Sequence, residues 1–390
     1  MLGKPFFYFS AGCLIFIVFP ALISFYLLSD LQVLTYLGIF FASYLCVCFG
    51  YILPSMSFFQ EKRRGIQLNL KFLKRLEYLL RMVALLAFLA SIHFVISRNE
   101  VAYGSGGGLS KIHQIIFYSS LYLYYIYLAI IVKSEVNSRR FYFISFLCIL
   151  PRLIVSLVWG RFFVVQILLP FIIVAFQKRC LKINFRIFFA LLILFLFVFI
   201  GLPILRGDSL NVADGVSLLQ FVMHGGPVHL IGLVEDIKIN YPKTNFLLTG
   251  LFGNSFPFLL GPDNKIDIWG AYGLPLTLDR AFADMEGTDF YSLTGPGSNY
   301  VAELLVIGGW GGVIIGSILL GSFLKLTSDL SRIKFVFMLP IIDAVSKSLL
   351  APRSNITYMF ERSIQLMIVF YIVVFFLGRF KVQNKKNPSC

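Results

Sequence analysis

The strongest constraint in this sequence is a series of apolar runs, each long enough to cross a lipid bilayer. A transmembrane helix needs about 20 mainly apolar residues to cross roughly 30 Å of hydrocarbon. Because backbone polar groups inside the bilayer must be satisfied within the segment, such runs predict an all-α polytopic membrane protein with about ten transmembrane helices. The runs cover residues 6–28, 33–55, 78–97, 114–132, 141–158, 162–177, 187–205, 299–323, 335–351 and 359–378, the ninth being the weakest.

Composition and charge narrow the class further. Hydrophobic residues make up 58% of the chain and charged residues 14%, whereas soluble domains carry about 25% charge, so a water-soluble domain is excluded. The Cys residues are sparse and mostly lie in or beside apolar runs, which indicates free thiols rather than a disulfide scaffold. A net charge of +15 would suggest nucleic acid for a soluble protein. In a membrane protein, the positions of the Lys and Arg residues indicate instead which loops face the cytoplasm, and no nucleic-acid partner is expected.

The distribution of Lys and Arg predicts this orientation. Basic residues are concentrated in alternate connections, and such connections face the cytoplasm. Both termini are therefore expected in the cytoplasm. The first span has no small-residue cleavage site and is followed by further spans, so we expect it to be retained as a signal-anchor. The basic segments expected in the cytoplasm lie at 62–75, 133–140, 178–186, 325–334 and 379–386.

One connection is much longer than the others and becomes abruptly polar after Leu205. It keeps aromatic residues, which predicts an ordered loop on the outer face. Val216 to Ile237 has the pattern of a helix broken at Gly225, Gly226 and Pro227, typical of an interfacial or re-entrant segment. The chain thus divides into a bundle of about seven helices at 1–205, a large outer loop at 206–298 and a bundle of about three helices at 299–390.

The basic stretch 61–77 has two interpretations. One face of a helix would carry Ile66, Leu70, Leu73 and Leu76, and the other would carry Lys71, Lys74 and Arg75. This pattern suits a surface helix on anionic headgroups. A solvated cytoplasmic loop explains the same charges equally well.

Four arginines are candidates for binding an anionic group. Arg161, Arg206, Arg280 and Arg353 are all expected at the outer ends of spans or in the outer loop. The guanidinium fork matches phosphate and carboxylate oxygens, so the four could converge on one headgroup. For any single Arg, contact with lipid phosphate at the interface is an equally good explanation.

Glu303, His224 and His229 are candidates for a general base. The two His flank the Gly-Gly-Pro break, and a pKa near 6.5 suits proton transfer. Glu303 lies about one turn inside its span, where an unpaired carboxylate is expensive, so it either pairs with an Arg or acts as the base. Taken singly, each His is more often structural.

Other polar residues in the apolar runs have simpler explanations. Asp343 and Lys347 are four residues apart, which predicts an internal ion pair. Gly308, Gly312 and Gly316 recur at the spacing that lets helices approach closely. No zinc motif occurs, and Asp284 with Glu286 is more typical of a solvated turn, so no metal site is expected. Arg81, Arg152 and Arg362 also fall within predicted spans.

Taken together, these features resemble the Wzy-type O-antigen or oligosaccharide repeat-unit polymerases of bacterial inner membranes. The resemblance covers most of the chain and rests on the number of spans, the late outer loop, Gly160-Arg161 before a span and Arg206 opening the loop. It also rests on an N-x-x-x-E-x-x-x-x-x-G-x-x-G run from Asn299 through Glu303 to Gly312. Many members have two large outer loops, whereas residues 98–113 form only a modest one.

The resemblance implies a GT-C-like, inverting and metal-independent membrane glycosyltransferase without a cofactor. Its substrates would be glycans linked to undecaprenyl diphosphate at the periplasmic face of the inner membrane. Arg161, Arg206, Arg280 and Arg353 would contact the diphosphate, and Glu303, His224 or His229 would supply the base. Membrane lipids, a chain-length regulator and a flippase are the implied partners.

Two other functions remain open from the sequence. An O-antigen ligase uses the same donor and differs in its acceptor, and sequence patterns separate the two poorly. A lipid-linked oligosaccharide flippase would also need cationic sites, but it is expected to show internal repeats of spans, and none is visible.

Overall fold

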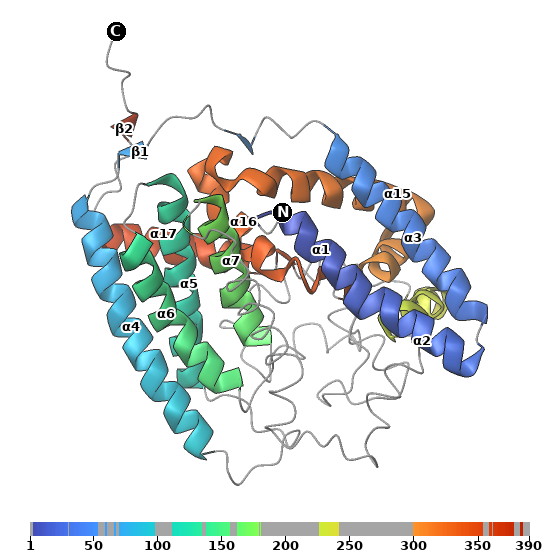
Figure 1. Cartoon of the computed structure of the whole chain (residues 1–390), viewed down its shortest axis with the longest axis horizontal. Helices are drawn as coiled ribbons and strands as arrows, with labels where there is room; N and C mark the ends of the chain where they lie inside the picture. Colours follow the sequence, from blue (N-terminus) through green and yellow to red (C-terminus); the bar gives the residue numbers. More distant parts are fainter. Residues whose placement is uncertain are drawn as a thin grey trace.

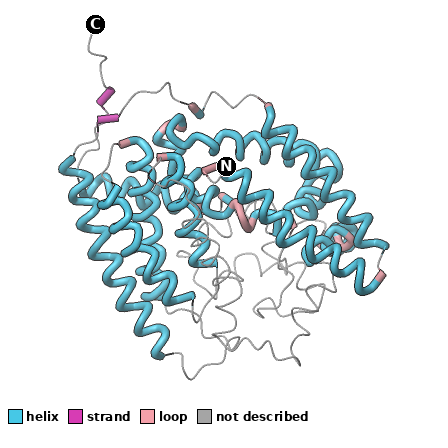
Figure 2. The backbone as a smooth tube through the Cα atoms, in the orientation of Figure 1, coloured by secondary structure: helices cyan, strands magenta, loops and turns pink. Residues whose placement is uncertain are grey.

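The computed structural model describes the chain as a helical assembly with one short strand pair (Figures 1 and 2). Apart from η1, a π-helical turn, the η elements are 3-10 helices. The described residues are 3–29, 31–53, 59–60, 66–67, 70–97, 111–134, 138–156, 162–178, 180, 226–241, 299–353, 359–360, 362–377 and 383–384. Their elements are α1 (Pro5–Cys13), η1 (Leu14–Val18), α2 (Phe19–Leu28), α3 (Leu31–Ile52), β1 (Ile66–Gln67), α4 (Leu70–Ser97), α5 (Lys111–Lys133), α6 (Ser138–Ser156), α7 (Phe162–Gln177), η4 (Gly226–Ile231), α11 (Val234–Asn240), α15 (Tyr300–Leu326), η5 (Thr327–Arg332), α16 (Phe335–Lys347), η6 (Ala351–Arg353), α17 (Ser363–Leu377) and β2 (Gln383–Asn384).

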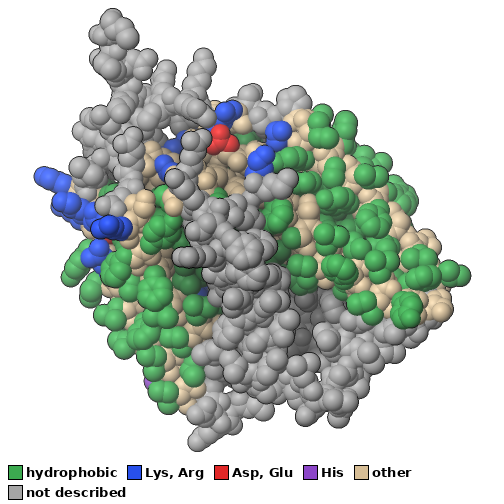
Figure 3. Space-filling model, viewed as in Figure 1, with side chains coloured by type: hydrophobic (Ala, Val, Ile, Leu, Met, Phe, Trp, Pro, Cys, Tyr) green, Lys and Arg blue, Asp and Glu red, His purple; other side chains and the backbone are tan. Residues whose placement is uncertain are grey.

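Several of these helices carry the apolar surface of a membrane protein. Large apolar side chains remain exposed along them, among them Leu45 at 68%, Ile315 at 62% and Phe375 at 81%. In Figure 3 apolar side chains cover the flanks of the molecule, and most visible Lys and Arg lie toward its upper part. Such a surface suits lipid, so the chain is a helical membrane protein. The segments long and apolar enough to cross a membrane are Pro5–Tyr26, Leu31–Ile52, Lys71–Ile96, Ile115–Lys133 and Tyr300–Arg332.

The predicted spans coincide with helices wherever the structure describes them. A helix lies within each predicted run except 187–205, which is outside the described residues. Some of these helices are short, however: α16 has 13 residues and α17 has 15. Ten crossings of the membrane therefore stay a prediction. The Cys residues in the described ranges, Cys13, Cys46, Cys48, Cys148 and Cys180, are free thiols, as predicted.

The start of α4 corrects one interpretation of the basic stretch 61–77. α4 is continuous from Leu70 to Ser97, so residues 70–77 are the first turns of a long apolar helix and not a separate surface helix. The apolar face was identified correctly within the helix, where Leu73 and Leu76 are buried, but Ile66 lies in β1 and is not part of it. It packs into the protein core, while Lys71 and Lys74 on the opposite face remain exposed.

The helices pack in two groups that each combine both ends of the chain. In the first group, α4, α6, α7, α16 and α17 surround α5 (Figure 1). α5 is buried on nearly all sides, including the side chains of Tyr124, Tyr125 and Tyr127. In the second group, the long contact of α15 with α3 is joined by α1, η1, α2, η4 and α11. The C-terminal helices thus take part in both groups. The division into bundles at 1–205 and 299–390 stays a prediction.

The α3–α15 contact depends on glycine. A Cβ on Gly321 would lie well under 3.0 Å from the Val47 carbonyl oxygen, and one on Gly50 would meet the Ile318 carbonyl oxygen at a similarly short distance. Ser322 donates to the Gly50 carbonyl at 3.2 Å, and the hydroxyls of Ser43 and Ser317 are 2.7 Å apart. Small residues and hydroxyl pairs of this kind hold helices together where hydrophobic burial provides little driving force.

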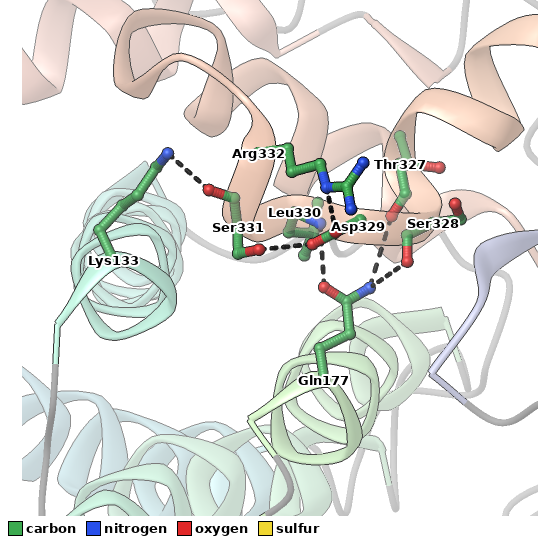
Figure 4. Close-up of polar contacts among 8 residues, drawn as sticks. All are labelled: Lys133, Gln177, Thr327, Ser328, Asp329, Leu330, Ser331 and Arg332. Carbon is green, nitrogen blue, oxygen red and sulfur yellow. Dashed lines mark hydrogen bonds and ion pairs between the residues drawn. The ribbon is translucent and has the colours of Figure 1, made fainter. Parts of the chain in front are cut away.

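The cytoplasmic segments predicted from charge meet at one end of the molecule. β1 pairs with β2 in antiparallel register, and Arg75 at the start of α4 donates to the Leu377 carbonyl at 3.0 Å. Gln177 closes α7 onto η5: its Nε2 lies 3.5 Å from the Thr327 carbonyl oxygen, and its Oε1 accepts from Leu330 N–H at 3.0 Å (Figure 4). These contacts require the segments to share one side of the membrane.

The close approach of α3 and α15 leads to a stability prediction. Gly321→Ala should lower the free energy of unfolding by about 1–3 kcal/mol, because the added methyl group must push the two backbones apart. The measurement is thermal unfolding of the purified protein in detergent. Gly38→Ala on α3 is the matched control: its Cβ meets nothing within 4 Å, so an unchanged or slightly raised melting temperature is expected. Equal losses in both variants would contradict the packing argument.

The shared end of the molecule leads to a topology prediction. A reporter fused after residue 240 should read out as periplasmic and one after residue 70 as cytoplasmic, because the basic segments collect at the end that contains residue 70. Alkaline phosphatase and fluorescent-protein fusions measure the two locations. A cytoplasmic signal at 240 would invert the orientation and remove every outer-face assignment.

Candidate active site

The candidate site is built around Glu303 on the first arm of α15. Asn299 caps this arm, with its side-chain Oδ1 accepting from the Val301 N–H at 2.9 Å. The Glu303 N–H donates to the Asn299 carbonyl at 3.0 Å, which closes the first turn. Glu303 is only 1% exposed. Carboxylates buried this far from water in membrane helices are rare, so Glu303 remains a candidate for a functional residue.

A glycine turn folds this arm back onto the rest of α15. Gly308 and Gly309 have non-helical backbone angles, and Gly309 has φ 56° and ψ −147°, a region open essentially only to glycine. As a result Leu304 lies against Gly312 and Gly316, where any Cβ would collide with its carbonyl oxygen or its side chain. The predicted close packing is confirmed for Gly312 and Gly316, and their packing partner, Leu304, belongs to the same element, α15. Gly308 serves the turn instead.

Contacts with α3 and α1 fix the orientation of the arm. Ser43 on α3 donates to the Tyr300 hydroxyl at 3.0 Å, and both residues are buried. The Tyr300 ring meets Phe9 and Phe40 edge-on, with centroids 5.8 and 5.9 Å apart. Because Tyr300 is three residues before Glu303, these contacts hold in place the helical turn from which Glu303 projects.

His229 belongs to the same packing group as Glu303. It is half-buried in η4, which contacts both α3 and α15. Gly232, just after η4, lies so close to Tyr36 of α3 that a Cβ there would collide with the phenol. η4 begins at Gly226, within the Gly-Gly-Pro motif, and is followed by α11. Residues 216–225 lie outside the described residues, so the interrupted helix stays a prediction. Two of the three predicted base candidates therefore come from neighbouring segments.

The remaining predicted site residues are placed less fully. His224, Arg161, Arg206 and Arg280 lie outside the described residues. The backbone of Arg353 ends η6, which packs against α1 where Gly12 lies close to the Leu349 carbonyl oxygen. Convergence of the four arginines on a diphosphate stays a prediction.

Sequence reasoning named a second group of charges without recognising that they meet. Lys347 Nζ lies 3.0 Å from Asp343 Oδ2, and both side chains are fully buried, so the predicted ion pair is confirmed. Arg152 on α6 and Arg362 before α17 are 1% and 9% exposed. The sequence feature that could have identified Arg152 and Arg362 is their position in the outer halves of apolar runs, at depths where charged residues are rare.

His93 and His113 lie at the end of the first helix group where α4 ends and α5 begins. His93 Nδ1 and His113 Nε2 are 3.3 Å apart, and the two rings are stacked. Partial burial, together with the nearby His93, lowers the pKa of the His113 imidazole. Within the described ranges, no three His, Cys, Asp or Glu side chains are grouped so that they could hold a metal ion.

The glycine turn leads to a prediction about Glu303. Gly309→Ala should lower the free energy of unfolding by about 1–3 kcal/mol, because a Cβ is strained at this backbone conformation although the surrounding space is open. It should also misplace the carboxylate and reduce turnover. Gly311→Ala is the control, since it has equally open space and helical geometry. Thermal unfolding and activity are measured for both, and equal behaviour would argue against a required turn.

Comparison with known proteins adds no assignment to this geometry. No family model matches the chain, and neither does any curated protein or solved structure. Functional interpretation therefore depends on the residues of the chain itself: the folded-back arm with Glu303, the adjacent His229 and the buried basic side chains.

Proposed function

We propose that this protein is an inverting membrane glycosyltransferase that polymerises oligosaccharide repeat units linked to undecaprenyl diphosphate. The observation that carries the proposal is the buried Glu303, which lies on a helix that contacts the segment containing His229. In this proposal Glu303 is the positioned base at one end of the membrane bundle. The sequence resemblance to repeat-unit polymerases supports the same assignment.

The chemistry of chain transfer requires two kinds of group. The acceptor hydroxyl oxygen attacks the anomeric carbon of the donor glycan, and its proton passes to the base. The bond from that carbon to the diphosphate oxygen breaks, and the lipid diphosphate leaves with the electron pair. A positioned base contributes roughly 10²- to 10⁴-fold, and cationic groups stabilise the departing charge. In this proposal the base is Glu303, with His229 as the alternative, and the cations are Arg161, Arg206, Arg280 and Arg353.

Burial and rigidity favour Glu303 over His229 as the base. The Tyr300 contacts and the Asn299 cap define the orientation of the arm, and catalysis depends on such preorganisation. His229 lies in a short 3-10 segment and is half-buried. His224 remains a third candidate from the sequence.

The finer architecture belongs to the same proposal. The chain would cross the inner membrane about ten times in a GT-C-like arrangement, with both termini cytoplasmic and residues 206–298 on the periplasmic face. Catalysis would need neither a metal ion nor a cofactor. Glycan-bearing lipids would be the substrates, and a chain-length regulator and a flippase the partners.

A flippase is the second candidate, and one observation favours it. Arg152, Arg362 and Lys347 place basic side chains inside the bundle, as expected of a protein that moves an anionic headgroup across the membrane. Ligase activity is the third alternative. The glycan profile of a deletion strain separates them: lipopolysaccharide capped with a single repeat indicates a polymerase, and loss of all O-antigen indicates a ligase or a flippase.

Substitution of Glu303 tests the proposal directly. With purified protein and synthetic lipid-linked repeat units, Glu303→Gln should reduce polymer formation by about 10²-fold or more, because the amide cannot accept the proton. Glu303→Asp should keep part of the activity, since it retains the carboxylate. Polymer formation should also persist in EDTA.

Glu77→Gln provides a matched control. Glu77 is an equally buried carboxylate that pairs with Arg140 at the start of α6, near the opposite end of the bundle. Its partner Arg140 is 40% exposed, so loss of the ion pair should lower the free energy of unfolding by no more than about 1 kcal/mol, with activity per folded molecule unchanged. If Glu303→Gln behaves in the same way as Glu77→Gln, Glu303 is a structural partner and the proposed base is wrong.

A further inference from the structure

We propose that α4 and α6 form a binding site for one phospholipid with a net negative headgroup, centred on Arg81 at the lipid-facing seam between the two helices. The site belongs to the first helix group, whereas Glu303 belongs to the second. It depends only on α4 and α6, so it would exist whether or not the chain is a polymerase.

Two contacts at successive levels define the seam. α4 and α6 run side by side (Figure 1), and Glu77 on α4 pairs with Arg140 on α6. One turn further along both helices, the Arg81 guanidinium lies 5.6 Å from the centroid of the Phe143 ring. Steps of four residues on α4 and three on α6 stay on one face of each helix. Arg81 and Phe143 therefore continue the seam that the ion pair begins.

The Arg81 side chain is open to the surroundings of the protein. Both Arg81 and Phe143 are exposed. Within the described part of the chain, the Arg81 guanidinium makes no hydrogen bond and no ion pair in addition to its contact with the ring. Glu77, one turn earlier, is buried and held by Arg140. Guanidinium donors at a lipid-facing surface need an acceptor, and a lipid phosphate supplies oxygens that match the guanidinium fork.

Arg81 also marks a boundary on the exposed face of α4. Lys74 and Tyr78, two turns and one turn earlier, are exposed. Tyrosine is enriched at the headgroup level, so the phosphate is expected near Tyr78. Helical side chains lean toward the N-terminus of their helix, which brings Arg81 back toward this level. Beyond Arg81 the exposed face can contact acyl chains, through Met82, Leu85, Leu86 and Leu89.

The charge around the seam favours an anionic lipid over a zwitterionic one. Glu77 is the single acidic residue on α4 and the first turn of α6, against six basic residues: Lys71, Lys74, Arg75, Arg81, Arg139 and Arg140. Figure 3 shows Lys and Arg side chains gathered at the left edge, where α4 begins, above a flank of apolar side chains. A zwitterionic headgroup brings its own ammonium group, which these residues repel. Phosphatidylglycerol carries the negative charge alone.

The test measures binding of single lipids to the full-length protein. Delipidated protein in a neutral detergent is titrated with phosphatidylglycerol or phosphatidylcholine, and native mass spectrometry counts the lipids bound. The first phosphatidylglycerol should bind at least about fivefold more tightly than the first phosphatidylcholine, since each nearby basic residue strengthens the attraction by about that factor.

Variants locate the site on the protein. Arg81→Gln should weaken binding of the first phosphatidylglycerol about fivefold, and Arg81→Lys, which keeps the charge and loses the fork, should weaken it less. Lys74→Gln should also weaken binding. Lys74 makes no polar contact within the described ranges, so this variant tests the site without disturbing the fold. Phosphatidylcholine binding should stay the same in all three variants.

Lys325→Gln is the matched control. Lys325 is a basic residue of α15 in the second helix group, and its ammonium also lies over an aromatic ring, 5.2 Å from the centroid of Tyr51. Its substitution removes one positive charge from the protein but none from the seam. The affinity for the first phosphatidylglycerol should therefore remain that of the wild type.

Two outcomes would overturn the proposal. One is equal affinity of the wild-type protein for phosphatidylglycerol and phosphatidylcholine. The other is that Arg81→Gln and Lys74→Gln bind phosphatidylglycerol as tightly as Lys325→Gln does. In either case the seam is ordinary lipid-facing surface without a selective site. Because the readout is lipid binding, neither outcome bears on the polymerase proposal.

Discussion

The contact between α3 and α15 is the constraint on which the rest of the candidate site depends. In lipid, two apolar helices gain little from burying their surfaces, so they associate through close van der Waals contact and hydroxyl pairs. Gly50 and Gly321 bring the two backbones together, and Ser43 links α3 both to Ser317 and to Tyr300. The same helix therefore anchors the long arm of α15 and orients the short arm that carries Glu303. A change at the crossing would reach the carboxylate without touching it.

Much of the helix content could be predicted from apolar runs, because a membrane allows few alternatives to a helix. The local ion pair of Asp343 and Lys347 was also predictable, since a spacing of four places both residues on one face. The glycines were harder. Gly308, Gly312 and Gly316 have the same spacing, yet one makes the turn and two receive Leu304. That difference arises from the folded-back geometry, which spacing alone does not specify.

The sequence could not reveal which charges meet. Arg152 and Arg362 are more than two hundred residues apart and on different helices, so only tertiary packing brings them to the same pair of rings on α5. The beginning of α4 was misjudged for a related reason. Basic residues on one face suggested a membrane surface, but the opposite face is buried against the protein. For the outer-loop arginines, the sequence remains the basis of the prediction.

The central position of α5 has a consequence for how the chain is assembled. Tyr122 finds its partner in Gln365, on a helix that the ribosome makes about 240 residues later. Until α16 and α17 are inserted, α5 has one side without its final neighbours, and the Tyr122 hydroxyl faces lipid or a temporary partner. The N-terminal helices therefore cannot reach their final packing during synthesis. A prematurely terminated chain would expose the polar side of α5 within the bilayer, a feature that membrane quality-control proteases can recognise.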